Sequence, residues 1–298
     1  MRFFTYGDPA HVVVSAGSGS PLVDLARAAA ARGEAMRPWM TDMAAFLAES
    51  EAALRWLGAD ALKRDDLAPA AGTRVLAPLP RPRRNIFCVG RNYLDHIKEG
   101  AVARGAAVEV TEVPIFFTKT PETVIGPEDP IDGHFGVTSR LDYECELAVV
   151  IGRTGRGIRK ADVLQYIAGY TLCNDVTARD LQRAHQQWFL GKSLDASSPF
   201  GPAIITPDEF GGLPHIGLRC LVDGELRQNM HTDAMIFDIP TVIESLSRAV
   251  TLMPGDIIAT GTGSGVGSAM NPPKFLQPGQ VVRCEGDGLP PLENRVAG

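Results

Sequence analysis

Two glutamates separated by a single residue constrain the fold of this chain more than any other feature of its 298 residues. Glu144 and Glu146 open a stretch that ends in the apolar, β-branched run 147–151, which is typical of a buried strand. Side chains two apart on a strand point to the same face, so the two carboxylates would lie about 7 Å apart or less. A cation between them would relieve the repulsion on an element that otherwise prefers burial.

A third carboxylate, Asp175, follows later in the chain, after a segment that we expect to be partly helical. Three oxygen ligands with neither His nor Cys beside them suit Mg²⁺ or Mn²⁺, with Ca²⁺ as a further candidate, rather than Zn²⁺. The alternative is a solvated strand face that happens to carry acidic residues. Spacing alone leaves both interpretations open.

Composition narrows the class of protein. Hydrophobic residues make up 45 % of the chain, as in an ordinary globular protein, and the formal net charge is −6. This acidic balance argues against broad electrostatic binding to nucleic acid or to an anionic membrane. The five cysteines are scattered singly, which indicates a reducing compartment, and no stretch is long and apolar enough to span a bilayer. We therefore expect a cytoplasmic protein.

The chain divides into two predicted domains. Residues 1–77 are expected to form a small N-terminal α/β domain. A proline-rich basic segment, 78–84, is the expected linker, and residues 85–298 form the expected catalytic domain. The three arginines of the linker are interpreted as solvated charges rather than as a binding patch.

The N-terminal domain is expected to begin with strands at 2–6 and 11–15. A first helix is predicted to start with Ser20 as its N-cap, and a second to span 41–57 and to end at Gly58.

Strands dominate after the linker, and no strict alternation of strand and helix is seen, which disfavours a doubly wound parallel sheet. The predicted strands are 86–89, 115–118, 143–151, 203–206, 217–222, 257–260 and 281–284, and the predicted helices are 161–169, 178–188 and 240–249. Asp180 fits a capping box opened by Thr177, so it is assigned a structural role rather than that of a ligand.

Two further positions carry candidate chemistry. His96 and Glu99 are three apart and would be neighbours on a helical turn, where Glu99 would orient the imidazole for general-base catalysis. Such pairs are also common on exposed helix faces. Lys192 follows an aromatic segment and is a candidate for stabilising a developing oxyanion, although a lone lysine is more often a surface residue.

A glycine-rich loop follows the predicted strand 257–260. It fits neither a dinucleotide-binding fingerprint nor a serine-nucleophile elbow, so its glycines are interpreted as allowing backbone N–H groups and the Thr262 hydroxyl to approach an anionic ligand.

In this order, these segments resemble the fumarylacetoacetate hydrolase family. The matching stretches are 88–99, 142–152, 169–182, 191–195, 235–237 and 252–267. The resemblance implies an α+β, mostly β fold, a mixed β-sandwich roll with barrel-like curvature, together with homodimers and a bound Mg²⁺ or Mn²⁺.

The resemblance also assigns roles to individual residues. It implies that the metal ligands are Glu144, Glu146 and Asp175, and that the catalytic residues are His96 and Glu99, on a lid segment, with Lys192. It implies that the substrate contacts are Arg179, Gln182, Thr262 and Tyr93.

Two departures from the family pattern qualify the expected activity. Gly263 stands where relatives commonly have Pro, and Val89 stands where fumarylacetoacetase carries an extra acidic metal ligand. The resemblance therefore favours the smaller bacterial branch, and implies hydrolysis of a carbon–carbon bond in a 2,4-diketo acid or acylpyruvate. Decarboxylation of oxaloacetate and keto–enol isomerisation share the same enolate and are the near alternatives. A non-catalytic oxyacid-binding protein is a more distant one, and a nucleotide-binding module is disfavoured by the loop.

Overall fold

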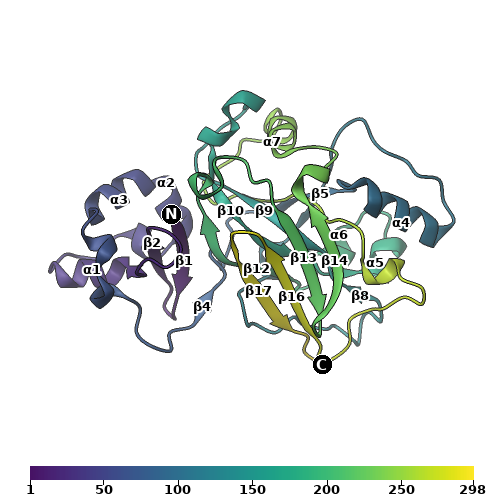
Figure 1. Ribbon diagram of the computed structural model, residues 1–298, viewed down its shortest axis with the longest axis horizontal. Helices are drawn as coiled ribbons and strands as arrows, with labels where there is room; N and C mark the ends of the chain where they lie inside the picture. The colour runs from purple at the N-terminus through teal and green to yellow at the C-terminus, as the bar shows by residue number, and fades with distance from the viewer.

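The computed structural model describes residues 1–298 as a mixed α+β molecule with more strand than helix (Figure 1). The helices are α1 (Leu25–Ala31), α2 (Met43–Ala48), α3 (Ser50–Leu57), α4 (Leu94–Arg104), α5 (Arg179–Ala184), α6 (Phe189–Lys192) and α7 (Ile239–Ser247). The strands are β1 (Arg2–Tyr6), β2 (His11–Ser15), β3 (Val23–Asp24), β4 (Val75–Leu76), β5 (Ile86–Gly90), β6 (Ile115–Lys119), β7 (Val124–Ile125), β8 (Leu141–Asp142), β9 (Cys145–Ile151), β10 (Ile167–Asn174), β11 (Thr177–Ala178), β12 (Ser198–Ile205), β13 (Gly217–Val222), β14 (Glu225–His231), β15 (Ile257–Ala259), β16 (Val281–Gly286) and β17 (Leu289–Arg295).

The main sheet has 11 strands: its path runs β3-β2-β1-β12-β10-β9-β15-β5-β6, and off this path β4 pairs with β1 and β7 pairs with β12. Strand β9 lies in the interior of this sheet and all seven of its residues are buried, which explains its nearly continuous apolar sequence. The path has two ends, at β3 and β6, so the sheet does not close on itself. The sheet is therefore open and not a closed barrel.

A second sheet of 4 strands, in the order β14-β13-β16-β17, packs against one face of the main sheet. Leu147 and Val149 of β9 belong to a cluster of 36 buried residues that also contains Leu218 of β13 and Cys284 of β16. The two sheets therefore form the sandwich that the sequence resemblance implied. All five cysteines are buried and unpaired, as expected for residues that pack as small hydrophobes.

The other face of the main sheet packs against the N-terminal region (Figure 1). Ala148 and Val150, which alternate with the sandwich-facing residues of β9, lie in a second cluster of 28 residues that also contains Phe3 and Phe46. Strand β1, which precedes the predicted linker, pairs with β12, which follows it. One sheet therefore contains strands from both predicted domains. That residues 78–84 separate two domains stays a prediction.

The N-terminal strands are confirmed, but the first helix is not where it was predicted. Helix α1 begins after Asp24, whose carboxylate accepts hydrogen bonds from the N–H groups of Ala26 and Arg27, so Asp24 rather than Ser20 is the N-cap. The predicted helix 41–57 is interrupted at Glu49, where φ is −120°, and forms α2 and α3. Gly58, with φ of 79°, ends α3 as predicted.

Two predicted helices of the central region are partly wrong. Segment 161–169 forms a short 3-10 helix (Lys160–Gln165) and then enters β10, because pairing with β9 outweighs the local helical preference. Segment 178–188 is helical only as far as Ala184, and the chain turns at Gln186, with φ of 47°. Asp180 does not form a capping box with Thr177; it accepts a 2.6 Å hydrogen bond from the Thr138 hydroxyl instead. Helix α7 and the strands that were predicted agree with the structure to within five residues at each end, whereas β14 and β17 were not predicted.

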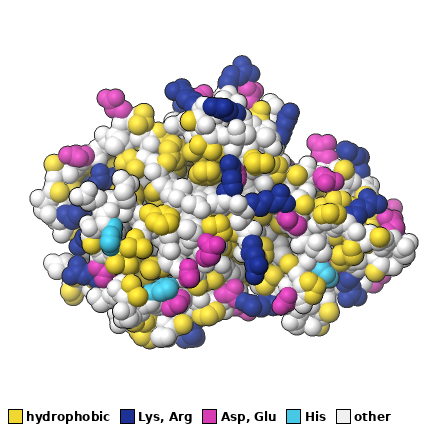
Figure 2. All heavy atoms as spheres, turned by 180° about the vertical axis from the view of Figure 1, so that it is seen from behind, with side chains coloured by type: hydrophobic (Ala, Val, Ile, Leu, Met, Phe, Trp, Pro, Cys, Tyr) yellow, Lys and Arg dark blue, Asp and Glu magenta, His cyan; other side chains and the backbone are white.

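The surface carries charges of both signs. On the face shown in Figure 2, Lys and Arg side chains are interspersed with Asp and Glu among hydrophobic residues. None of the helices combines the length and the apolar character that crossing a membrane requires.

Candidate active site

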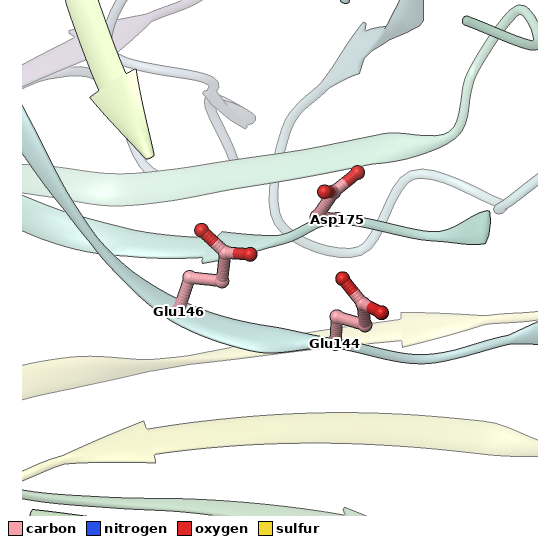
Figure 3. Close-up of side chains that lie close together, drawn as sticks. All are labelled: Glu144, Glu146 and Asp175. Carbon is pink, nitrogen blue, oxygen red and sulfur yellow. The ribbon is translucent and has the colours of Figure 1, made fainter. Parts of the chain in front are cut away.

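Three carboxylates converge where β9 begins and β10 ends (Figure 3). Glu144 directly precedes β9, Glu146 is its second residue, and Asp175 directly follows β10. Antiparallel pairing places Cys173 opposite Glu146, and the N–H of Asp175 donates to the carbonyl of Glu144 at 2.8 Å. One oxygen from each carboxylate lies within 4.8 Å of the others. Strand pairing thus brings the predicted metal ligands together, although Asp175 follows a strand rather than a helix.

Burial and mutual repulsion disfavour the ionised form of one carboxylate of this triad. Burial raises the pKa of Glu146 well above its ordinary value, and the charges of Asp175 and Glu144 raise it further. Burial acts in the same direction on Glu144, but Lys192 and Arg179 outweigh it and lower the pKa of that carboxyl. Glu146 itself contacts no cationic side chain; its carboxylate accepts a 2.7 Å hydrogen bond from the N–H of Gly261. An all-oxygen donor set in which one carboxylate has no cationic partner fits Mg²⁺, Mn²⁺ or Ca²⁺.

Two buried lysines flank the carboxylates. Lys192 Nζ lies 2.7 Å from Glu144 Oε2 and 2.6 Å from Asp175 Oδ2. Burial opposes its charge, but these two carboxylates raise its pKa, so it stays an ammonium ion. Lys119, at the end of β6, donates to Asp175 Oδ1 at 2.7 Å and is completely buried. Asp175 is therefore held by two lysines, of which sequence reasoning identified only Lys192.

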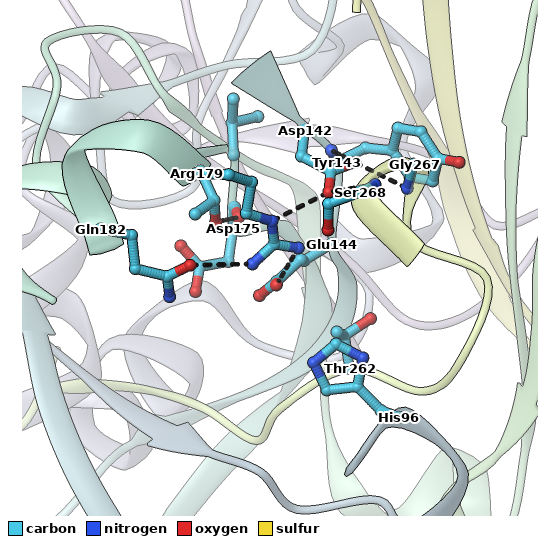
Figure 4. Close-up of polar contacts among 12 residues, drawn as sticks. His96, Asp142, Tyr143, Glu144, Asp175, Arg179, Gln182, Thr262, Gly267 and Ser268 are labelled. Atoms are coloured by element: carbon cyan, nitrogen blue, oxygen red, sulfur yellow. Dashed lines mark hydrogen bonds and ion pairs between the residues drawn. The ribbon is translucent and has the colours of Figure 1, made fainter. Parts of the chain in front are cut away.

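Arg179 fixes the position of Glu144 (Figure 4). Its Nη2 lies 2.6 Å from Glu144 Oε1, its Nε donates to Asp142 Oδ2 at 2.9 Å, and its Nη1 donates to Gln182 Oε1 at 3.2 Å. Three of its groups are thus committed to protein partners. Gln182 accepts from Arg179 through its oxygen, so its amide N–H groups remain as donors. Both predicted substrate contacts therefore keep donors: the guanidinium of Arg179 has N–H groups beyond the three used here, and the amide NH₂ of Gln182 is unused.

Asp142 anchors Arg179 and was not singled out from the sequence. Its carboxylate also accepts from the N–H groups of Gly267 and Ser268, at 2.8 and 3.0 Å (Figure 4). It therefore ties the glycine-rich loop to the triad. The signal was present, because Asp142 is two residues before Glu144 and so shares the period of two that relates Glu144 to Glu146.

The hydroxyl of Thr262 is already occupied. It donates to the carbonyl of Cys145 at 2.7 Å and accepts from the side-chain amide of Gln228 at 2.8 Å. Its one hydrogen is therefore not free for an anionic substrate, and it anchors the loop beside β9. Thr262 still lines the cavity, so its predicted role as a substrate contact stays a prediction.

Gly263, the departure from the family's usual Pro, has a steric explanation. A Cβ added there would lie 2.7 Å from Met230 Sδ and 2.8 Å from Met230 Cβ. The methionine side chain occupies the space that a larger residue would take, so glycine and Met230 form a matched pair.

His96 and Glu99 meet on the first turns of α4, as their spacing predicted. His96 Nδ1 lies 2.9 Å from Glu99 Oε1, and the second oxygen of Glu99 accepts from the N–H of Gly265 at 2.8 Å. Because a carboxylate can only accept, His96 carries its hydrogen on Nδ1 and presents Nε2 as a base. Glu99 also links α4 to the glycine-rich loop.

A cavity of about 290 Å³ joins these elements. It is lined by His96 from α4, by Glu144 and Glu146, and by Gln182 and Lys192 from α5 and α6. In Figure 4 the His96 ring and Thr262 lie across from Glu144. Most lining residues are polar, as suits a small charged substrate.

Tyr93 does not line this cavity. Its side chain is 2 % exposed, its hydroxyl has no hydrogen-bond partner, and burial raises its pKa. Asp175 and Glu99 also lie outside the lining, behind Lys192 and His96 respectively. The predicted contact between Tyr93 and substrate gains no support from this placement.

Comparisons with known proteins agree with this architecture. The family model for the fumarylacetoacetate (FAA) hydrolase C-terminal domain matches residues 85–297. The chain is 47 % identical over 223 residues to oxaloacetate tautomerase YisK of Bacillus subtilis (strain 168), covering 75 % of this chain and 73 % of the relative.

Solved structures have a similar fold. The fumarylacetoacetate hydrolase of psychrophilic Exiguobacterium antarcticum has a TM-score of 0.81 and 38 % identity, covering 100 % of this chain and 99 % of the other. Maleylpyruvate hydrolase from Sphingobium sp. SYK-6, solved with manganese (II) ion and pyruvate, has a TM-score of 0.76 and 27 % identity, with the same coverage.

The fold and the buried carboxylate triad define an enzyme of a metal-binding β-sandwich class. The chain belongs to the fumarylacetoacetate hydrolase family. The family includes both hydrolases and tautomerases, and members act on small keto acids.

Proposed function

We propose that this enzyme interconverts the keto and enol forms of a small 2-oxo acid, with oxaloacetate as the leading substrate. This ranks the isomerase alternative above the hydrolysis that the sequence favoured. The relative from Bacillus subtilis, named an oxaloacetate tautomerase, supports the ranking. The structural observation that carries the proposed proton transfer is the His96 imidazole, which lines the same cavity as the carboxylates and whose Nδ1 is held by Glu99.

Glu144, Glu146 and Asp175 would hold the divalent cation, which when bound supplies Lewis-acid polarisation of the 2-oxo group and so acidifies the C3 protons. We assign Mg²⁺ or Mn²⁺ because the donors are all oxygen. Lys192 and Arg179 balance two of the carboxylates, so the loaded site carries enough positive charge to attract a carboxylate substrate.

The proton transfer falls to His96. Its Nε2 would take a proton from C3 as the keto form becomes the enolate. The enolate oxygen would gain a proton from solvent as the enol leaves, and the imidazolium would lose its proton to solvent; the reverse reaction runs through the same steps. Glu99 holds the hydrogen on Nδ1 and stabilises the imidazolium that forms after the transfer. Lys192 would stabilise the negative charge that develops on the 2-oxo oxygen.

The test compares the rate of loss of enol-oxaloacetate absorbance with the rate of pyruvate release from a panel of acylpyruvates, on one preparation loaded with Mg²⁺. We expect accelerated tautomerisation and little pyruvate release. Tautomerisation no faster than the buffer rate, with turnover of an acylpyruvate, would overturn the ranking. No turnover of either would favour the non-catalytic oxyacid-binding alternative.

Hydrolysis of an acylpyruvate remains the second candidate, because a structural neighbour at 27 % identity is a maleylpyruvate hydrolase. In that reaction His96 would activate water, so His96→Ala would lower hydrolysis by about 10²–10⁴-fold. Decarboxylation of oxaloacetate needs mainly the divalent cation as an electron sink, so its rate would fall less than the rate of hydrolysis. If hydrolysis and decarboxylation fall equally while metal stays bound, the role of His96 in activating water is refuted.

We also propose, from the family resemblance, that the enzyme is a homodimer. Light scattering on the purified protein should give twice the mass of one chain, and the mass of a single chain would contradict the proposal.

A further inference from the structure

Three arginines line the cavity without contacting a carboxylate. They come from three elements: Arg91 follows β5, Arg104 ends α4 and Arg183 lies in α5. Desolvation and the neighbouring charges of Arg91 and Arg183 lower the pKa of Arg104, and no acidic group acts in the opposite direction. Such a concentration of like charge is unfavourable unless it serves an anion.

The backbone at Arg91 is held in an uncommon conformation. Its φ is 54°, in the left-handed region that favours glycine, and the next residue, Asn92, is anchored through its side chain. The Asn92 side chain is buried, donates to the carbonyls of Phe237 and Thr260 at 3.0 and 2.8 Å, and accepts from the N–H of Phe237 at 2.8 Å. Backbone strain of this kind concentrates at functional sites, because the surrounding structure has to maintain it.

The cavity has two chemically different ends. Glu144 and Glu146 are buried and form its floor, whereas Arg104 and Arg183 are exposed and form its mouth. The cation and the 2-oxo acid head belong at the floor. A ligand that reaches from the floor to the mouth meets guanidinium groups at its other end.

We propose that Arg91, Arg104 and Arg183 bind a second carboxylate, so that the enzyme selects 2-oxo dicarboxylates over 2-oxo monocarboxylates. The inference rests on the proposed function for the identity of the reactive head. A carboxylate among the arginines replaces their repulsion with charge-assisted hydrogen bonds. Because Arg104 lies on the same helix as His96, binding of the second carboxylate also favours α4 in the position that places His96 over the cavity.

The test uses L-malate and L-lactate, two unreactive 2-hydroxy acids with the same chelating head, of which only malate has the distal carboxylate. Their dissociation constants are measured by calorimetry on the Mg²⁺-loaded protein. We expect malate to bind about 10–100-fold more tightly than lactate, the usual value of a hydrogen bond to a charged group. Arg104→Gln and Arg183→Gln should remove most of that preference and leave lactate binding unchanged.

Lys98→Gln is the matched control, because Lys98 is an exposed residue of the same helix that pairs with Asp95 outside the cavity. It should keep the preference for malate. Equal binding of malate and lactate by the unaltered protein, or a preference that survives both arginine substitutions, would overturn the inference. Since these acids do not react, a malate preference without oxaloacetate turnover would overturn the proposed function and leave the arginine site standing.

Discussion

Replacing Asp142 with Asn should destabilise the fold, although Asp142 is outside the metal triad. Its Oδ2 accepts from Arg179 Nε at 2.9 Å and from the N–H of Ser268 at 3.0 Å, while Oδ1 accepts from the N–H of Gly267 at 2.8 Å. The amide of Asn keeps one acceptor oxygen, which can retain the bond to Gly267. The NH₂ group in place of Oδ2 faces two donors and can accept from neither.

The size of the effect follows from these contacts. Each buried donor left without a partner costs about 1–3 kcal/mol, and breaking a buried ion pair costs about 3–5 kcal/mol. Arg179 keeps its ion pair with Glu144, so we expect a loss near the lower end of the range for a broken buried ion pair. The free energy of unfolding should fall by about 3–4 kcal/mol. With an unfolding entropy of about 2.1 cal/mol/K per residue over 298 residues, Tm should fall by about 5–6 °C.

Differential scanning calorimetry of the metal-free protein measures this shift without interference from ligand binding. Asp60→Asn is the control, because Asp60 pairs with Lys63 at 3.1 Å but its side chain is 99 % exposed. Exposed pairs contribute about 0–1 kcal/mol, so its Tm should change by less than about 2 °C. If Asp142→Asn shifts Tm no more than the control does, the bonds to Arg179 and Ser268 do not hold the loop and the reasoning fails.

Three further outcomes are expected. Glu146→Gln should weaken metal binding by at least the roughly 10–100-fold that loss of an outer-shell partner costs, and an unchanged affinity in a metal titration would remove Glu146 from the ligand set. Because burial raises the pKa of Glu146, metal binding should release a proton, so the apparent affinity should rise with pH until that carboxyl is ionised. Calorimetry in buffers of different ionisation enthalpy measures this proton, and a binding enthalpy independent of buffer would count against it. Finally, the amides of α4 should exchange more slowly with oxalate bound, as a lid requires, and equal protection in both states would argue that α4 does not move.

Two of the three candidate metal ligands were accessible from sequence because they obey a local rule. The period of two on a strand relates Glu144 to Glu146, and β9 forms where its apolar run predicted. The same holds for His96 and Glu99, which are three apart on α4 and make the expected contact.

The features that sequence reasoning missed depend on distant partners. Lys119 contacts Asp175, 56 residues later, and nothing in its own segment indicates this pairing. Segment 161–169 has residues that favour a helix, but its second half enters β10 because β9 and β12 are available on either side. Strand order and the open ends of the sheet likewise come from pairings that no local pattern specifies.

The roles of side chains were harder to predict than their locations. Arg179 and Thr262 both line the cavity, yet most of their hydrogen-bonding groups are committed to Asp142, Glu144, Cys145 and Gln228. Which donors remain free for a substrate is decided by those partners, and a sequence motif does not contain that information.

Exchange of the C3 protons of oxaloacetate with solvent deuterium tests the central claim most directly. Followed by NMR in D₂O on the Mg²⁺-loaded enzyme, it reports the proton transfer assigned to His96 without requiring any bond to carbon other than C–H to break. We predict that the enzyme accelerates exchange and that His96→Ala lowers the enzymatic rate by about 10²–10⁴-fold, with bound metal unchanged. Exchange that is no faster than in buffer, or that is unaffected by His96→Ala, would contradict the account.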